Sequence, residues 1–274
     1  MQEGRKSMNK QKDDKIRSAV RDNYSRIALS GGTGCCRSNS SCCGKPDDIT
    51  ASEISMGLGY TKDDLFAAPE GANIGLGCGN PQAIASLKTG ETVIDLGSGG
   101  GFDSFLAARA VGEQGLIIGV DMTPEMISKS LTNAAKAGFT NVDFRLGELE
   151  YLPVADGIAD VIISNCVINL SPDKERVFSE AFRVLKPGGR IAISDVVATK
   201  EMPQDIREDI RFYAGCVGGA ATIEEIQSIM QKAGFDQIRI ELKPESRMFI
   251  RDWIPGSNIE DYVLSATIEA VKPL

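Results

Sequence analysis

Residues 91–103, ETVIDLGSGGGFD, decide the fold, because they join an apolar run to a series of glycines and then to a helical pattern. Residues 92–96 are mostly apolar and partly β-branched, which predicts a buried strand. The glycines of residues 97–101 allow a tight turn, and residues 104–111 have the periodicity of a helix. The stretch therefore predicts a strand, a loop and a helix in direct succession.

The same unit follows at once in residues 115–138, GLIIGVDMTPEMISKSLTNAAKAG. Its strand is expected to end at Asp121, and its helix has Thr123 as N-cap, Pro124 in the first turn and Gly138 just past the end. Strands and helices continue to alternate up to Val197. Such alternation predicts an α/β fold with a doubly wound, mostly parallel sheet.

Three regions are expected along the chain. A cysteine-rich segment, residues 1–50, contains a charged helix at residues 11–30. The α/β domain occupies residues 51–198. Residues 199–274 form a small α+β part with a helix near residues 205–213, a helix opened by the capping box of Thr222 and Glu225, and strands in FDQIRIELKP and SRMFIRDW.

Composition excludes several classes of function. The chain of 274 residues has a net charge of −8, which argues against nucleic acid and against acidic membranes as partners. The apolar run that a membrane span or a signal peptide needs is absent, so a cytoplasmic location is expected. The seven cysteines should then be reduced thiols. Histidine is absent, which excludes Cys/His zinc sites and Ser-His catalysis.

Three signals point to a nucleoside ligand. The glycine loop lies at the carboxyl end of the first predicted strand, where open α/β sheets bind ligands. Asp121 ends the next strand, where a carboxylate can accept both hydroxyls of a ribose, and Gly147, Glu148 and Leu149 follow the third strand, where they could flank an adenine. Phe102 replaces the third glycine of a dinucleotide fingerprint, which leaves an NAD-dependent enzyme as a minor alternative.

These motifs, with GELEYLP and RVLKPGGRIAISD, resemble those of the class I S-adenosylmethionine-dependent methyltransferases over residues 73–198. The resemblance implies a Rossmann-like fold and S-adenosyl-L-methionine as cofactor. It also implies a cofactor-binding set, which consists of Asp95, Gly97, Ser98, Gly99, Gly101, Asp121, Met122, Gly147, Glu148, Leu149 and Asn165.

Three single cysteines lie in loops that this fold would bring near a transferred methyl group. Cys78 is flanked by glycines in GLGCGNP, Cys166 follows the apolar run DVIISN, and Cys216 lies in YAGCVGGA. A free cysteine is usually a small buried apolar residue. Three thiols without histidine, however, suit a soft three-coordinate guest such as trivalent arsenic better than tetrahedral zinc.

NIGLGCGNP, the region around NCVINL and YAGCVGGA resemble the arsenite methyltransferases, over about residues 50–230. The resemblance implies arsenite and methylarsenite as substrates in arsenic detoxification, with Cys78, Cys166 and Cys216 as thiolate ligands of arsenic(III). It further implies a disulfide between Cys78 and Cys166 during turnover, reset by glutathione or thioredoxin. A seven-stranded sheet with an antiparallel hairpin edge, formed by FDQIRI and SRMFI, and a monomeric state are also expected.

The remaining four cysteines, Cys35, Cys36, Cys42 and Cys43, lie in GCCRSNSSCCG. We interpret this segment as an accessory that captures arsenic by two or three sulfurs at a time. Zinc is an alternative, although the spacing lacks the C-x2-C of a zinc knuckle, and so is a tail without function.

Two other functions compete with arsenic methylation. A methyltransferase of a carbon or oxygen nucleophile, such as a quinone ring, would share the cofactor motifs but leave Cys78 and Cys216 without a role. A non-catalytic arsenic- or metal-binding protein would use the thiols but would not need the cofactor loop.

Overall fold

The computed structural model describes residues 2–30, 50–254 and 256–274. They form a seven-stranded sheet in the order β3-β2-β1-β4-β5-β7-β6. Strands β1 to β5 are parallel, and β7 pairs antiparallel with both β5 and β6. The predicted doubly wound sheet with an antiparallel hairpin edge is thereby confirmed. The strands are β1 (Thr92–Leu96), β2 (Leu116–Asp121), β3 (Val142–Leu146), β4 (Ala159–Asn165), β5 (Leu185–Ala198), β6 (Asp236–Lys243) and β7 (Val263–Val271).

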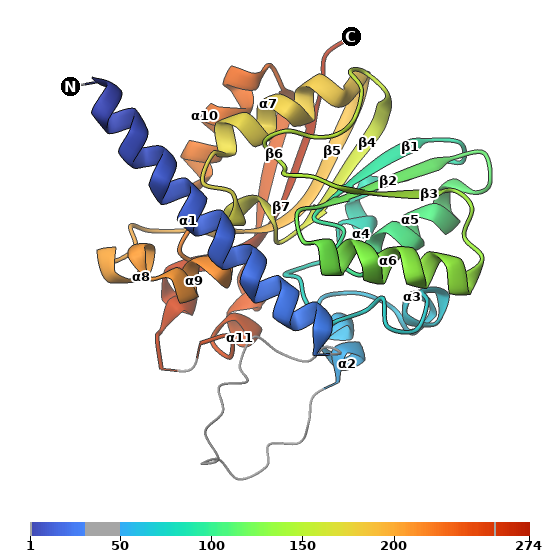
Figure 1. Ribbon diagram of the computed structural model, residues 1–274, viewed down its shortest axis with the longest axis horizontal. Coiled ribbons are helices and arrows are strands. Elements are labelled where there is room, and N and C mark those ends of the chain that lie inside the picture. Colours follow the sequence, from blue (N-terminus) through green and yellow to red (C-terminus); the bar gives the residue numbers. More distant parts are fainter. Residues whose placement is uncertain (1, 31–49, 255) are drawn as a thin grey trace.

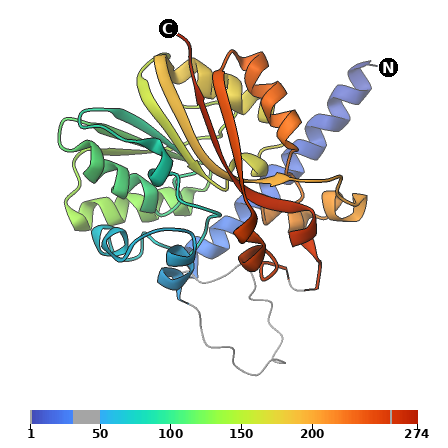
Figure 2. The ribbon, with the colours of Figure 1, turned by 180° about the vertical axis from the view of Figure 1, so that it is seen from behind.

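Helices cover both faces of the sheet, as Figures 1 and 2 show. Helices α4, α5 and α6 pack on one face, and α7 and α10 pack on the other. The central strands are buried on both faces, which explains their nearly continuous apolar sequence. The helices are α1 (Gln2–Leu29), α2 (Ala51–Gly57), α3 (Lys62–Ala67), α4 (Gln82–Ala85), α5 (Phe102–Val111), α6 (Pro124–Ala137), α7 (Lys174–Val184), α8 (Gln204–Glu208), α9 (Ile210–Ala214), α10 (Ile223–Ala233) and α11 (Arg247–Ile250).

Helix α1 precedes the α/β fold in the sequence and packs across its surface. It crosses the front of the molecule diagonally in Figure 1 and contacts α6 and α9. Val20 is fully buried in this contact. None of the helices in the described ranges is both long and apolar enough to span a bilayer.

Two predictions about the C-terminal region are wrong. SRMFI forms the short helix α11 instead of a strand, and the hairpin partner of β6 is β7. Pro244 ends β6 and opens a helical turn that leads into α11, because its fixed φ suits the start of a helix. The single helix expected near residues 205–213 is broken into α8 and α9 at Asp209, whose extended backbone and carboxylate cap α9.

Candidate functional site

The three single cysteines converge beside the carboxyl edge of the sheet. Cys166 follows β4, Cys78 precedes α4 and Cys216 follows α9. They are 8%, 2% and 3% exposed and all are free thiols. The Sγ atoms of Cys78 and Cys166 lie within 4.8 Å of each other, and the Cys216 thiol donates to the Cys166 carbonyl at 2.8 Å. The fold therefore gathers three thiols from distant parts of the chain into one cluster, the thiol cluster.

Two of these cysteines have a backbone conformation that is unfavourable for any residue with a side chain. Cys166 has φ of 59° and Cys216 has φ of 63°, in the left-handed region that glycine or asparagine would normally occupy. A residue held in this region costs on the order of 1 kcal/mol or more, and such strain gathers at functional sites. Cysteine at both positions therefore favours a role for the sulfur atoms over a role in core packing.

The thiols are protonated in the absence of a guest. Burial raises the pKa of Cys78, and the hydrogen bond with Cys166 together with burial raises the pKa of Cys216 well above its usual value. A guest that binds as thiolate must therefore release these protons, which coordination to a soft centre does.

Asn165, the last residue of β4, holds the Cys78 segment in place. Its side-chain oxygen accepts the Cys78 N–H at 3.0 Å, and its side-chain nitrogen donates to the Gly79 carbonyl at 2.8 Å. The same nitrogen lies 3.0 Å from the Tyr60 hydroxyl, which donates to the Asp103 carboxylate at 2.7 Å. This network joins the thiol cluster to the first turn of α5, which follows the glycine loop.

The glycine loop after β1 has the features of a ligand cradle. Gly97 and Gly101 have φ of 72° and 92°, and a Cβ at Gly97 would lie 2.3 Å from the Val167 side chain. A Cβ at Gly99, in contrast, would meet no atom within 4 Å. The Ser98 hydroxyl is buried without a hydrogen-bond partner. The loop thus presents backbone to open space and holds an orphaned hydroxyl, both of which suit a bound polar ligand.

Acidic residues surround this loop. Asp121, at the end of β2, accepts the N–H groups of Gly99 and Thr123 at 3.0 and 2.8 Å. Asp95 is buried and accepts the Ser104 hydroxyl at 2.5 Å. Burial raises the pKa of Asp95 to about 8 and that of Asp103 to about 6. Asp121 is the carboxylate whose place at a strand end fits a ribose.

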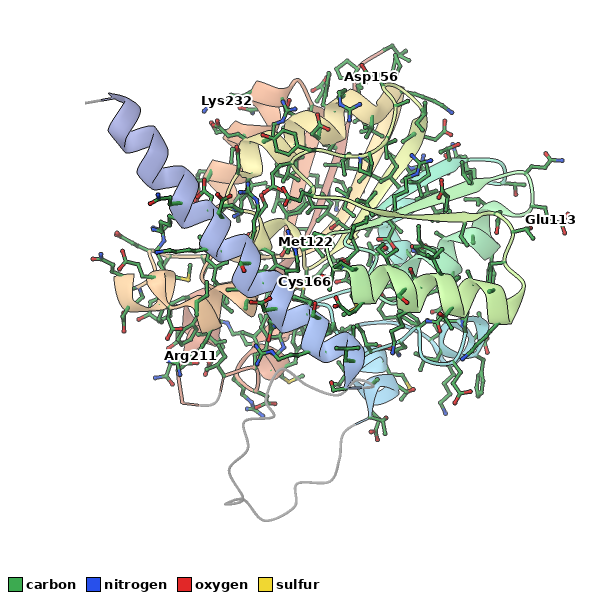
Figure 3. The ribbon with its side chains drawn as sticks, in the orientation of Figure 1. Glu113, Met122, Asp156, Cys166, Arg211 and Lys232 are labelled. Atoms are coloured by element: carbon green, nitrogen blue, oxygen red, sulfur yellow. The ribbon has the colours of Figure 1, made fainter. Side chains whose placement is uncertain are left out.

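Helix α1 covers both the thiol cluster and the segment after β3. Val20 and Met122 share one apolar cluster with the three cysteines, and Figure 3 shows Met122 and Cys166 near each other beside α1. Arg21 pairs with Glu148 at 3.3 Å, and Arg17 pairs with the buried Glu150 at 3.1 Å. Leu149, between these two acids, is buried. The helix therefore shields this edge of the sheet from water.

Replacing Arg17 by alanine is expected to loosen α1. Glu150 would lose its charged partner while it stays buried, which costs about 2 kcal/mol. The amides of residues 16–28 should then exchange hydrogen about 30-fold faster. Hydrogen exchange followed by mass spectrometry measures this effect. Arg26→Ala is the matched control, because Arg26 is exposed and bonds only within its own helix; equal protection in both variants would contradict the role of the Arg17 pair.

Sequence reasoning missed one acidic residue at the thiol cluster. Asp195, near the end of β5, has a carboxylate oxygen within 4.8 Å of the Sγ atoms of Cys78 and Cys166. Burial raises the pKa of Asp195 to about 6. Lys174 at the start of α7 interacts electrostatically with Asp195 and Cys216, and burial lowers the pKa of Lys174 to about 8. A carboxylate at the end of a parallel strand, the signal that identified Asp121, could have identified Asp195.

The remaining predicted positions divide into two groups. Gly147, Glu148 and Leu149 follow β3 at the same edge of the sheet as the glycine loop, and a Cβ at Gly147 would lie 2.7 Å from Pro153. Cys35, Cys36, Cys42 and Cys43 lie outside the described residues.

Comparisons with known proteins agree with this geometry. Residues 87–234 match the family model described as "Methyltransferase domain". The arsenite methyltransferase of Halobacterium salinarum is 49% identical over 267 residues, which are 95% of this chain and 67% of that protein. The chain belongs to the arsenite methyltransferase family.

Two further members of the arsenite methyltransferase family support this assignment. The enzyme of Aquipseudomonas alcaligenes is 43% identical over 171 residues, which cover 60% of this chain and 49% of that protein. The crystal structure of an arsenic(III) S-adenosylmethionine methyltransferase from Chlamydomonas reinhardtii has a TM-score of 0.59 and 33% identity, and the match covers 84% of this chain and 75% of that one. The chain thus spans about half to three quarters of the length of these family members.

Proposed function

We propose that this chain transfers methyl groups from S-adenosyl-L-methionine to trivalent arsenic bound by Cys78, Cys166 and Cys216. The observation that carries the proposal is the convergence of three free, buried thiols beside a ligand cradle at one edge of the sheet. Arsenite and methylarsenite are the substrates, and their methylation serves arsenic detoxification.

The residues of the cradle fit the cofactor. Asp121 would bind the ribose, the backbone of residues 97–101 would approach the methionine part, and the segment of Glu148 and Leu149 would flank the adenine. The orphaned Ser98 hydroxyl and the open space at Gly99 leave room for these contacts. When bound, S-adenosyl-L-methionine supplies an electrophilic methyl group on a sulfonium.

Binding of arsenite to the thiol cluster needs no external base. Each thiol replaces one hydroxide of arsenite, and its proton leaves with that hydroxide as water, so three thiols form a neutral arsenic trithiolate and three waters. Arsenic(III) keeps its lone pair in this complex, and the lone pair accepts the methyl group with no proton to remove. The chain therefore needs only to align arsenic with the methyl group and to exclude water, which Val20 and the rest of α1 help to do.

Methylation leaves arsenic in the pentavalent state, so two electrons must return to it. We assign them to Cys78 and Cys166, whose sulfur atoms are close enough to approach each other for a disulfide. As the disulfide forms, the two As–S bonds of Cys78 and Cys166 break and their electron pair reduces arsenic to the trivalent state. Water then binds arsenic and loses one proton, which leaves a neutral methylarsenical on Cys216. Glutathione or thioredoxin restores the two thiols by exchange.

Asp121→Ala is expected to weaken binding of S-adenosyl-L-methionine by about 10- to 150-fold, since hydrogen bonds to a charged group contribute roughly 1.5–3 kcal/mol. Affinity for arsenite should change little, because Asp121 is not part of the thiol cluster. Calorimetric titration with each ligand separates the two sites. Asp143→Ala, in a partly exposed ion pair with Arg145, is the control; unchanged cofactor affinity in Asp121→Ala would remove Asp121 from the site.

The activity itself is tested by incubating the chain with arsenite, S-adenosyl-L-methionine and glutathione, followed by arsenic speciation. We expect methylated arsenicals to appear with time. Bound arsenic without methylated product would instead indicate a sequestering protein. Methylation of a quinone precursor but not of arsenite would indicate the carbon-directed enzyme.

Three further features belong to this proposal. Cys35, Cys36, Cys42 and Cys43 act as an accessory that raises the local arsenite concentration, with zinc binding as the alternative. The chain works as a monomer, and it works in the cytoplasm, where its seven cysteines stay reduced.

A further inference from the structure

Asp195 is a buried acid that the thiol chemistry described above does not use. It is 2% exposed, and its carboxylate lies within 4.8 Å of the sulfur atoms of Cys78 and Cys166. Among the described residues, one group of three cysteine or acidic side chains is close enough together to bind a single ion, and it consists of Cys78, Cys166 and Asp195. Burying a charged carboxylate costs free energy, and the protein must offset this cost with hydrogen bonds or opposite charges.

The fold holds this carboxylate with three donors. The N–H groups of Ile168 and Val196 and the side-chain amide of Asn169 donate to it at 2.9, 2.7 and 2.9 Å. Hydrogen bonds of this kind favour the charged form of the acid. Asp195 is therefore a fixed negative charge, oriented before any substrate binds.

Charge moves toward this carboxylate during methylation. The arsenic lone pair forms the new As–C bond, while the C–S bond of the donor breaks and its electron pair stays on that sulfur. The donor loses its positive charge, and the neutral arsenic trithiolate becomes a cation. No proton moves in this step. A positive charge that is absent from the bound substrate thus develops within a few ångströms of Asp195.

We propose that Asp195 accelerates methyl transfer by stabilising the positive charge that develops on arsenic. This inference rests on the proposed function and deepens it. A fixed opposite charge at about 5 Å in a water-excluded site stabilises a transition state by an amount that corresponds to about 100-fold in rate. The bound trithiolate carries no net charge, so Asp195 contributes little to arsenic affinity.

Lys174 favours the charged form of this carboxylate. Its ammonium group interacts electrostatically with Asp195 and with Cys216, and the attraction to Asp195 opposes the rise in the pKa of that acid that burial causes. Replacing Lys174 would therefore also change the charge on Asp195. Asp195→Ser is the better second variant, because it removes the carboxylate as Asp195→Asn does but leaves a smaller polar side chain, so an effect of charge should slow methyl transfer in both variants alike.

The test compares the unchanged chain with Asp195→Asn and Asp195→Ser at pH 7. Methyl transfer is measured as a single turnover of preformed arsenite complex. Arsenite affinity is measured separately, without cofactor, from the fluorescence of Trp253, which packs against the apolar cluster that contains the thiols. We expect Asp195→Asn and Asp195→Ser each to transfer methyl about 100-fold more slowly, with arsenite affinity within twofold of the unchanged chain.

Each other outcome overturns the inference. A rate in Asp195→Asn within threefold of the unchanged chain leaves no electrostatic role, and a parallel loss of rate and arsenite affinity shows that Asp195 only positions the Cys166 segment. Should Asp195→Asn not fold, Asp195→Ser decides, since a rate within threefold of the unchanged chain contradicts a role for the charge. An unchanged chain that binds arsenite but never methylates it refutes the proposed function itself.

Discussion

Replacing Cys166 by serine is expected to abolish methylation of both arsenite and methylarsenite, with a loss on the order of 10³-fold or more in kcat/KM. Serine keeps the size of the side chain but offers a hard, protonated oxygen in place of a soft thiolate, and trivalent arsenic binds sulfur far more strongly. Cys216→Ser should have the same effect, because both substrates need at least two thiolates. Initial rates of methylated product formation measure the loss.

The thermal stability of the variants distinguishes loss of an arsenic ligand from unfolding of the protein. Cys166 and Cys216 both have positive φ, so Cys166→Gly and Cys216→Gly relieve backbone strain of about 1 kcal/mol while they remove a small buried side chain. The two effects oppose each other, and we expect the thermal midpoint to stay within a few degrees while methylation is lost. Serine variants with more than a tenth of the original activity would contradict a ligand role for either cysteine.

Cys78→Ser is expected to distinguish the two substrates. Arsenite has three hydroxides to exchange for sulfur, and methylarsenite has only two. Without the Cys78 thiol, arsenite should be methylated at least about 100-fold more slowly, whereas methylarsenite should keep its rate within about tenfold. Single-turnover assays are required, because Cys78 is also assigned to the disulfide that forms after methyl transfer. Arsenite methylation at the original rate would refute the three-thiolate assignment.

Local sequence signals were sufficient to predict the parallel strands β1 to β5 of the sheet. The ends of β1 fall at the predicted residues, and α6 has Thr123 as N-cap, Pro124 in its first turn and Gly138 at its C-cap. The capping box of Thr222 and Glu225 is also present. These features depend on residues a few positions apart, so one sequence contains the necessary information.

Contacts between distant residues could not be predicted in this way. The pairing of Arg17 with Glu150 spans 133 positions and places α1 over the thiol cluster, but the sequence of α1 shows only a charged helix. The link from Asn165 to Tyr60 and Asp103 likewise follows from tertiary packing. SRMFI was misassigned because a short apolar run without neighbours suits either a strand or a helix.

The convergence of the thiols could be predicted from the sequence more readily than the rest of the site. Parallel strands bring their carboxyl ends to one edge, which places Cys166 near the glycine loop. The positive φ of Cys166 and Cys216, the strongest sign that these sulfur atoms have a function, is visible only in the structure.

The most direct measurement of the central claim is the X-ray absorption spectrum of arsenite bound to the full chain in which Cys35, Cys36, Cys42 and Cys43 are replaced by serine. Only Cys78, Cys166 and Cys216 then remain as thiols. We predict three sulfur neighbours and no oxygen neighbour around arsenic, with two sulfurs when Cys78 is also replaced. A first shell dominated by oxygen, or one that does not change when Cys78 or Cys166 is replaced, would contradict the account.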